Sequence, residues 1–249
     1  GSGVGFDGTG DYLTLQSTSD VSFGTGDFTI EFWVKKPDST QGGFFQISST
    51  VGGFTSSSYA NTIAAAWNGG AWQMYGGGVD ATGNGSITAN AWYHIAVVRS
   101  SNTLKMYVNG TSVMSRSDTN NYSHTYLGIN GYYSTTYTNK GQLSNFRVVK
   151  GTAVYTGNFT PPTAELTSIA NTKLLCCNTP VMTTATVTPN DITVYGNSHP
   201  SGGPFTAIDG EGGMVWMKAR NTSVDFVLMD TERGIDKLMF TNGTWNQEA

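Results

Sequence analysis

The chain has 249 residues, a formal net charge of −4 and an isoelectric point near 5.2. Its 38% hydrophobic and 12% aromatic residues can form a core, which excludes a disordered tail. Its 13 Lys and Arg residues are scattered, which excludes a nucleic-acid partner because neutralising phosphates takes clustered cations.

Charged residues make up only 12% of the chain, about half of the usual ~25%. Gly, Ser, Thr and Asn are abundant instead, as in extracellular or particle-borne β proteins. No apolar run approaches the ~20 residues of a membrane-spanning helix, so we expect no membrane insertion. The chain begins with Gly-Ser-Gly rather than Met, and we expect an interior segment or a processed product.

The first predicted strands cover residues 3–6 and 11–15 and are joined by a Gly-rich turn. Residues 28–34 alternate between a hydrophobic and a second face, which predicts a strand with one buried side. Residues 44–49 continue the pattern, and residues 61–67 are predicted to pair with 72–75. We expect little helix, apart from a short turn near residues 151–155.

Residues 92–110 form the centre of the pattern. Apolar alternation over 92–98 reaches the turn at 100–102, and a second strand over 104–108 ends on Asn109-Gly110. Because Asn-Gly tolerates positive φ, this pattern predicts antiparallel hairpin strands. His94 lies within the alternation, and we interpret it as a satisfied core residue.

Further strands are predicted over residues 126–129, 143–150 and 172–177, the last returning the chain to a sheet edge. Residues 179–190 carry few large apolar side chains, which favours a connector or an exposed strand. Residues 214–218 and 225–230 then predict another strand pair. The only cysteines, Cys176 and Cys177, are adjacent, and we expect two buried free thiols and a reducing environment of assembly.

Four ordered motifs carry a family resemblance. They are FDGTGDYL, GDFTIEFWV, WYHIAVVRS with NTLKMYVNGT, and LSNFRVVKGTAVYTGNFTPP. Together they resemble laminin-G-like domains of the concanavalin A-like lectin/glucanase superfamily. The resemblance implies an all-β fold, a jelly roll of two packed antiparallel sheets over residues 1–178, often used to bind carbohydrate.

A second resemblance begins after residue 210. The segments GGMVWMKAR and VLMDTERG resemble a module of tail-fibre proteins from tailed bacteriophages. We therefore divide the chain into a sandwich over 1–178, a linker or exposed strands over 179–210, and the incomplete start of a phage-fibre-like β module over 211–249.

The acidic residues disfavour catalysis. Retaining glucanases of this fold need two glutamates close together on one strand. This chain has five Glu residues, no two within four positions of each other, and Glu31 is the only one in a predicted core strand. We expect no enzyme.

Asp7 and Asp11 flank a Gly-rich turn and are the candidate calcium ligands. Several members of the superfamily bind calcium. The alternative is that Asp is simply a favoured turn residue. Zinc is disfavoured because an adjacent Cys pair lacks the spacing of zinc ligands.

Aromatic side chains with polar neighbours mark two candidate sugar-binding sets, because rings stack on sugar faces and amides bond hydroxyl groups. The alternative is that the tryptophans pack in the core or at a subunit interface. The first set is Trp67, Trp72 and Tyr75 with Asn68 and Gln73, and the second is the loop of Tyr132, Tyr133 and Tyr137.

The resemblances imply a non-enzymatic structural and adhesive protein of a phage virion, a tail fibre or similar appendage. Its partners would be other virion proteins and a host-surface glycan or receptor, it would form a homotrimer, and it would be assembled in the host cytoplasm. One alternative is a carbohydrate-binding module of a secreted bacterial enzyme or adhesin. Another is a virion decoration domain without a ligand.

Overall fold

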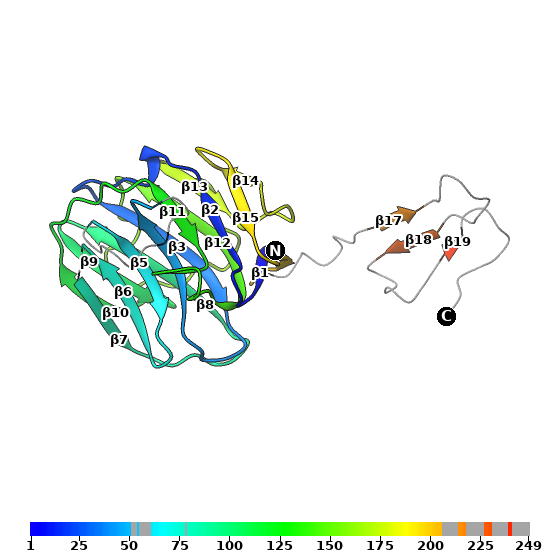
Figure 1. Cartoon of the computed structure of the whole chain (residues 1–249), viewed down its shortest axis with the longest axis horizontal. Coiled ribbons are helices and arrows are strands. Elements are labelled where there is room, and N and C mark those ends of the chain that lie inside the picture. Colours follow the sequence, from blue (N-terminus) through cyan, green and yellow to red (C-terminus); the bar gives the residue numbers. More distant parts are fainter. Residues whose placement is uncertain are drawn as a thin grey trace. The chain divides into compact units, whose positions relative to one another are not determined.

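The computed structural model describes residues 1–50, 54, 61–77, 79–205, 214–217, 227–230 and 239–240. The chain divides into two units, Gly1–Phe205 and Thr206–Ala249. The first unit consists of two antiparallel sheets packed face to face (Figure 1), which confirms the all-β sandwich prediction. The described part contains one helix, the 3-10 turn Ser19–Val21 (η1), and the helical turn predicted near residues 151–155 does not form. No described helix is long and apolar enough to span a membrane.

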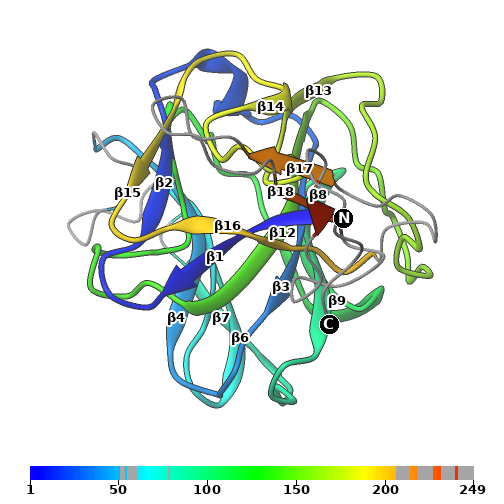
Figure 2. The ribbon, with the colours of Figure 1, turned by 90° about the vertical axis from the view of Figure 1, so that its right-hand side faces the viewer.

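The nine-stranded sheet has the order β10-β9-β8-β3-β12-β1-β16, and β13 and β14 extend it beside β12. Figure 2 shows β16, β1 and β12 next to one another. The strands of the nine-stranded sheet are β1 (Ser2–Asp7), β3 (Phe28–Lys35), β8 (Trp92–Ser100), β9 (Thr103–Val108), β10 (Thr111–Ser117), β12 (Lys140–Lys150), β13 (Thr172–Cys176), β14 (Ala185–Val187) and β16 (His199–Gly202).

The seven-stranded sheet has the order β15-β2-β11-β4-β5-β6-β7. The consecutive strands β1 and β2 therefore lie in different sheets, and the turn between them crosses from one layer to the other. Its strands are β2 (Tyr12–Leu15), β4 (Gly42–Ser48), β5 (Ile63–Trp67), β6 (Ala71–Gly76), β7 (Val79–Asn84), β11 (Tyr126–Ile129) and β15 (Ile192–Tyr195).

The predicted central hairpin of β8 and β9 forms, and a second hairpin follows it, because β10 pairs with β9 although no strand was predicted over residues 111–117. Ser101 and Asn102 link β8 to β9 with φ of 47° and 62°, and Asn109 and Gly110 link β9 to β10 with φ of 48° and 77°. Positive φ at both central residues is the turn geometry that matches the twist of two paired strands. The Asn-Gly dipeptide was therefore a correct hairpin signal.

The core lies between the two sheets. In β8, Ile95 and Val97 face this core, whereas Ala96 and Val98 point to the outer side of the nine-stranded sheet. The segment of residues 151–171 covers that outer side with Tyr155, Phe159 and Ala153. Both faces of the central strand are buried, which explains why its sequence is apolar at nearly every position.

The segment predicted as a linker or exposed strands over residues 179–210 contributes three strands to the sandwich. β14 pairs with β13, β15 pairs with β2, and β16 pairs with β1. The first unit therefore extends to Phe205 rather than to residue 178. The sequence resembles a connector because these strands are short and expose one or both faces, so they need few large apolar residues.

In the second unit the structure describes three antiparallel strands, β17 (Met214–Met217), β18 (Val227–Asp230) and β19 (Met239–Phe240). The predicted pairing of residues 214–218 with 225–230 is confirmed for the strand positions. The other residues of the module predicted over 211–249 lie outside the described part of the chain.

Candidate functional site

The two tryptophans of the first candidate set are core residues. Trp67 and Trp72 are each 2% exposed, and their ring centroids lie 5.0 Å apart between the sheets. The indole Nε1 of Trp67 donates a hydrogen bond to the carbonyl oxygen of Ser39, 2.9 Å away. Asn68 closes the β5–β6 turn by accepting from the amides of Gly70 and Ala71. The two indole rings are therefore not surfaces on which a sugar can stack.

The tyrosines of the two candidate sets lie together on the outer face of the seven-stranded sheet. The rings of Tyr75 and Tyr132 stack with centroids 5.5 Å apart, and Tyr137 packs against Tyr132 at 5.5 Å. Tyr133 and Tyr137 are 40% and 36% exposed, whereas Tyr132 is buried. Gln73 points to the same outer face as Tyr75 and is nearly buried. We call Tyr75, Tyr132, Tyr133 and Tyr137 the tyrosine cluster.

Hydrogen bonds fix the loop between β11 and β12, which carries Tyr132, Tyr133 and Tyr137. The backbone amide of Tyr133 donates to Oε1 of Gln46, 2.8 Å away, and Gln41 Nε2 donates to the Tyr132 hydroxyl at 2.7 Å. Gly43 allows the loop to approach β4, since a Cβ there would collide with the backbone of Tyr132. The loop therefore covers the outer face of this sheet around β4.

On the other half of the same face, a cavity of about 380 Å³ lies over β15, β2 and β11. Aromatic rings line it from two strands: Tyr126 is half-buried and Tyr195 is 39% exposed. Tyr12 stacks on Tyr195 with centroids 4.4 Å apart, and Phe54 contacts the Tyr12 ring edge-on at 5.4 Å. The full lining is Thr14, Leu15, Gln16, Ser17, Tyr126, Thr193 and Tyr195.

The register of the strands places the polar groups of this cavity. Thr193 and Thr14 are a cross-strand pair of β15 and β2, and Thr14 is paired with Gly128 of β11. The residues on either side of Thr14, Leu13 and Leu15, face the core. Thr14 and Thr193 therefore point outward together, with Gly128 beside them.

The cavity suits a ligand that is rich in hydroxyl groups. Threonine and serine hydroxyls and the Gln16 amide each donate and accept hydrogen bonds, as sugar hydroxyls do. Tyrosine rings provide rigid apolar area against which the C–H face of a pyranose can pack. None of the lining residues is Asp or Glu. The cavity therefore offers binding groups and no carboxylate pair for hydrolysis.

None of the residues that line this cavity, nor Tyr12 beside them, was among the predicted site residues. A signal was present in residues 192–195, where Ile192 and Val194 alternate with Thr193 and Tyr195. That alternation is typical of a strand with one solvent-facing side. It was overlooked because residues 179–210 were interpreted as a linker or exposed strands outside the sandwich of residues 1–178.

Asp7 and Asp11 lie together, as the calcium hypothesis requires, but their oxygens already accept hydrogen bonds. The amides of Asp7 and Asn197 donate to the two carboxylate oxygens of buried Asp11 at 2.6 and 2.5 Å. The hydrogen bond from the Thr9 amide to Asp7 Oδ1 is the main cause that lowers the pKa of Asp7, and Asn197 Nδ2 lies 3.3 Å from Oδ2. N–H donors thus stand where a cation would have to bind.

No group of three or more His, Cys, Asp or Glu side chains converges on a metal position in the described residues. Asp7 and Asp11 therefore do not fit a calcium ion in this structure. The pair instead joins the turn at residues 7–11 to the turn at Gly196 and Asn197.

Glu31 belongs to a buried network beneath the covering segment. Its Oε1 accepts from Arg147 Nε at 2.9 Å and Nη2 at 2.5 Å. Its Oε2 accepts from the Tyr155 hydroxyl at 2.8 Å and lies 3.1 Å from Nε2 of His94. Burial alone raises the pKa of Glu31, but His94 and Arg147 outweigh it and hold the pKa below its usual value. His94 is thus buried and partnered through Nε2, but its buried Nδ1 has no hydrogen-bond partner among the described residues, so the predicted satisfied core residue is confirmed only in part.

The comparisons with known proteins agree with this fold. A family described as the concanavalin A-like lectin/glucanases superfamily matches residues 7–158. A proposed carbohydrate-binding protein from Bacteroides ovatus superposes with a TM-score of 0.55 at 13% identity, over 80% of this chain and 59% of that protein. This chain thus spans about three fifths of that relative. At such identity the likeness shows the fold alone.

Two further structures are less similar. The pentraxin of Limulus polyphemus has a TM-score of 0.46 at 15% identity, over 62% of this chain and 77% of its own. Domain 4 of the Geobacillus stearothermophilus arabinanase AbnA, solved with arabinotriose, has a TM-score of 0.46 at 15% identity, over 61% of this chain and 72% of its own. No functionally curated protein is similar to this chain in sequence.

Proposed function

We propose that this chain, which belongs to the concanavalin A-like lectin/glucanase superfamily, is a non-enzymatic glycan-binding protein whose site lies on the outer face of the seven-stranded sheet. The observation that carries the proposal is the cavity over β15, β2 and β11, with the rings of Tyr126 and Tyr195 beside the hydroxyls of Thr14 and Thr193. Because no lining residue carries a charge, the ligand is a neutral glycan.

Binding without hydrolysis is supported by the placement of Glu31. Its carboxylate is buried on the outer side of the other sheet and is engaged by Arg147, His94 and Tyr155. It therefore cannot act on a sugar in the cavity of the seven-stranded sheet.

A neutral-glycan array probed with the full chain tests this proposal. We expect Tyr195→Ala to reduce binding of the strongest ligand at least tenfold, because it removes the exposed ring of the cavity. Tyr137→Ala is the matched control, since Tyr137 is similarly exposed but belongs to the tyrosine cluster. Binding lost in Tyr137→Ala and kept in Tyr195→Ala would move the site to the tyrosine cluster. No bound glycan at all would reject the proposal.

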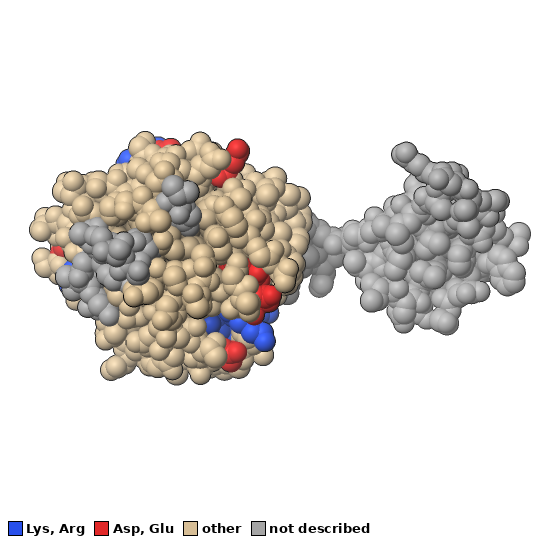
Figure 3. Space-filling view, in the orientation of Figure 1, with Lys and Arg blue, Asp and Glu red and all other residues tan. Residues whose placement is uncertain are grey.

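We propose further that the chain is a structural and adhesive component of a tailed-bacteriophage virion, a homotrimeric tail fibre or similar appendage that contacts host-surface glycan or protein. The resemblance of residues 211–249 to a tail-fibre module supports this assignment. The low content of charged residues also supports it, and Figure 3 shows few blue or red atoms, which mark the charged residues, on the face that it draws. Threefold display would raise the avidity of a weak site.

Mass photometry of the full-length product and antibody labelling of the parent particle test the assignment. A trimer that labels a fibre or another projection would agree with it. A monomer found on no particle would contradict it and favour a carbohydrate-binding module of a secreted enzyme or adhesin. A labelled particle whose host attachment survives Tyr195→Ala would favour a decoration domain without a ligand.

A further inference from the structure

The two cysteines lie at the end of β13 and are buried, as predicted. Cys176 is fully buried, Cys177 is 2% exposed, and both belong to the core between the two sheets. Both are free thiols, and their Sγ atoms lie 3.7 Å apart. Successive side chains of an extended strand point to opposite faces, so two adjacent thiols side by side in one core need a physical cause.

The cause is the backbone of Cys177. Its φ of 58° lies in the left-handed region, which residues with a Cβ rarely adopt. This conformation ends the strand and turns the Cys177 side chain to the core side on which Cys176 lies. The carbonyl oxygen of Cys177 accepts a hydrogen bond from the amide of Asn145, 3.0 Å away, which holds the conformation in place. Backbone strain of this kind concentrates at functional sites.

The two sulfurs are close enough to become bonded. They need to approach by about 1.7 Å to reach the S–S bond length of about 2.05 Å, a change that side-chain rotation can provide. A disulfide usually joins residues whose Cα atoms are at least about 4.4 Å apart, whereas those of neighbouring residues are about 3.8 Å apart. The bond would therefore be strained, and strained disulfides are reduced easily and serve labile rather than structural roles.

We propose that Cys176 and Cys177 are a redox site, at which a peroxide converts the two thiols into a disulfide between adjacent residues. Such a pair stays reduced in a cytoplasm and becomes oxidised in an oxidising medium. The disulfide fixes the backbone where the chain leaves β13 for β14, β15 and β16, the last strands of the first unit. The inference does not depend on the proposed glycan-binding cavity.

The reaction consumes one peroxide for each disulfide. The Cys177 thiolate attacks one oxygen of the peroxide, the O–O bond breaks, and Cys177 becomes a sulfenic acid while one water is released. The sulfur of Cys176 then attacks the sulfenic sulfur, the S–S bond forms, and the hydroxyl group leaves with the proton of Cys176 as a second water. The two thiols are oxidised and the peroxide is reduced, so no other reactant is needed.

The order of attack follows from the surroundings of Cys176. The hydrogen bond with the Cys177 thiol, followed by burial, raises the pKa of Cys176, which therefore stays a thiol at neutral pH. The thiolate is the nucleophile, which assigns the first attack to Cys177. Oxidation of Cys177 then changes the partner that is the largest cause of this shift. Cys176 thus resolves the sulfenic acid.

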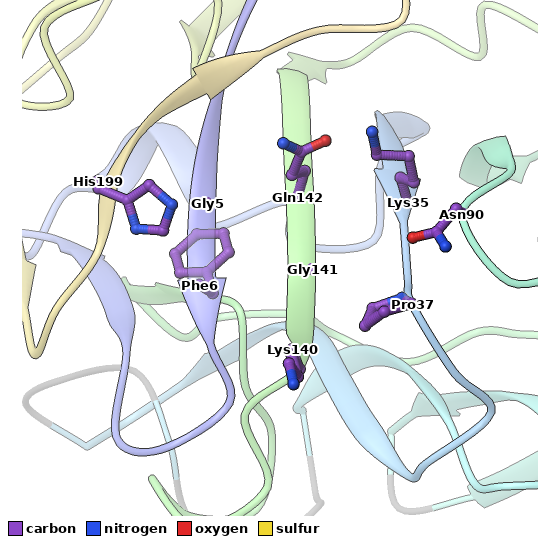
Figure 4. Close-up of a pocket in the computed structure, with 9 residues that line it drawn as sticks. All are labelled: Gly5, Phe6, Lys35, Pro37, Asn90, Lys140, Gly141, Gln142 and His199. Atoms are coloured by element: carbon purple, nitrogen blue, oxygen red, sulfur yellow. The ribbon is translucent and has the colours of Figure 1, made fainter.

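The surroundings of the pair favour a small oxidant. Neither cysteine lines the cavity of about 260 Å³ that Figure 4 shows between Lys35 and His199, nor the proposed glycan-binding cavity. Beside the pair, β14 is a three-residue edge strand that pairs with β13 at two positions, and such edges open locally at low free-energy cost. A peroxide, which is little larger than water, is therefore the oxidant that fits this site.

Treatment of the folded full chain with hydrogen peroxide, followed by denaturation, alkylation with N-ethylmaleimide and mass spectrometry, tests this inference. We expect the untreated chain to be alkylated on both cysteines and the treated chain on neither, because the disulfide blocks both thiols. The peptide that contains them should lose the mass of two hydrogen atoms, and dithiothreitol should restore both alkylation sites. Reading this peptide alone keeps methionine oxidation out of the result.

Trapping with a 1,3-diketone tests the order of attack. Brief exposure of the wild type to peroxide should label Cys177 and not Cys176. Cys176→Ala is the matched variant: it lacks the resolving thiol, so labelled Cys177 should accumulate at least tenfold above the wild-type level. The alkylation result on the wild type remains decisive if this core variant does not fold.

Four results would overturn the inference. Both thiols could stay open to alkylation after peroxide treatment, which would make them inert core residues. Cys177 could be oxidised to the sulfinic acid without a bond to Cys176. The disulfide could join two chains, seen as a dimer on a non-reducing gel. Finally, a diketone label on Cys176 in the wild type would contradict the assigned roles.

Discussion

The rings of Tyr12 and Tyr195 lie face to face on neighbouring strands, 4.4 Å apart between centroids and 13° from parallel. The two residues are a register pair of β2 and β15, so the stack is set by the sheet itself. Tyr195 lines the proposed glycan-binding cavity, and Tyr12, which lies outside the lining, packs against the Tyr195 ring. A ring held in place in this way loses little entropy when a ligand binds.

Removing the Tyr12 ring should weaken the binding of a neutral glycan, although Tyr12 does not line the cavity. We expect Tyr12→Leu to lower the affinity for a neutral glycan several-fold, and to reduce the free energy of unfolding by about 0.5 to 1.5 kcal/mol through loss of the aromatic pair. Calorimetric titration and urea denaturation measure the two effects. An unchanged affinity, alongside a clear loss in Tyr195→Ala, would show that the stack does not orient Tyr195.

Trp72→Ala should act on stability and not on recognition. Trp72 is buried between the sheets against Trp67 and Phe44, so its loss should cost about 3 to 5 kcal/mol of unfolding free energy. Denaturation of the variant checks the cost, with Tyr137→Ala as a control that should change stability little. If Trp72→Ala folded as stably as wild type and lost glycan binding, the assignment of Trp72 to the core would be wrong.

The alternation of side chains along β6 could have shown from the sequence that Trp72 faces the core while Tyr75 faces outward. Trp72 and Tyr75 are three residues apart, so in a strand they point to opposite faces and cannot form one sugar-binding platform. Successive side chains of a strand point to opposite faces, and for this reason the apolar alternation of residues 28–34 and 92–108 predicted strands correctly. The cavity itself could not be predicted, because β15 joins β2 across about 180 residues of chain, and no local pattern specifies such a pairing.

Glu31→Gln tests the buried network. Removing the carboxylate charge leaves Arg147 buried without its counter-ion, which should cost about 3 to 5 kcal/mol of unfolding free energy at neutral pH. Thermal or chemical denaturation measures the loss. The exposed Glu165→Gln is the control and should change stability little. A Glu31→Gln/Arg147→Met double variant should recover part of the loss, and no recovery would contradict the ion-pair explanation.

The same carboxylate predicts an acid-side pH dependence. The pKa of Glu31 is lower in the folded protein than its ordinary value of 4.5. The unfolded chain therefore takes up the proton first as the pH falls, and stability from this group is lost below about pH 4.5. In Glu31→Gln the unfolding free energy should fall less steeply over that range. Parallel pH profiles of the two proteins would contradict the prediction.

Lys36 predicts the opposite behaviour on the alkaline side. Burial lowers its pKa from 10.5 to about 8, although Asp38 partly opposes this, and its Nζ donates to Asn139 Oδ1 at 2.5 Å. The folded protein then releases the proton before the unfolded chain does, so stability from this group rises between pH 8 and 10.5. Relative to Lys36→Met, the wild type should gain up to about 3 kcal/mol over that range. A constant difference between the two proteins would reject this account.

The composition of the last strands explains why the predicted boundary at residue 178 lies before the end of the first unit at Phe205. A strand at a sheet edge buries only one side, and β15 buries Ile192 while Thr193 and Tyr195 stay exposed. Such a strand carries too few apolar residues to differ from a linker in composition. Its pairing with β2 holds it in the sheet, and Thr193 and Tyr195 complete the lining of the proposed glycan-binding cavity.

A crystal structure of the full chain with the strongest neutral glycan from the array would test the central claim most directly. We predict a sugar ring in the cavity between Tyr126 and Tyr195, packed against the Tyr195 ring, with hydroxyls bonded to Thr14 and Thr193. Glycan bound at the tyrosine cluster, or only at loops away from the outer face of the seven-stranded sheet, would contradict the account.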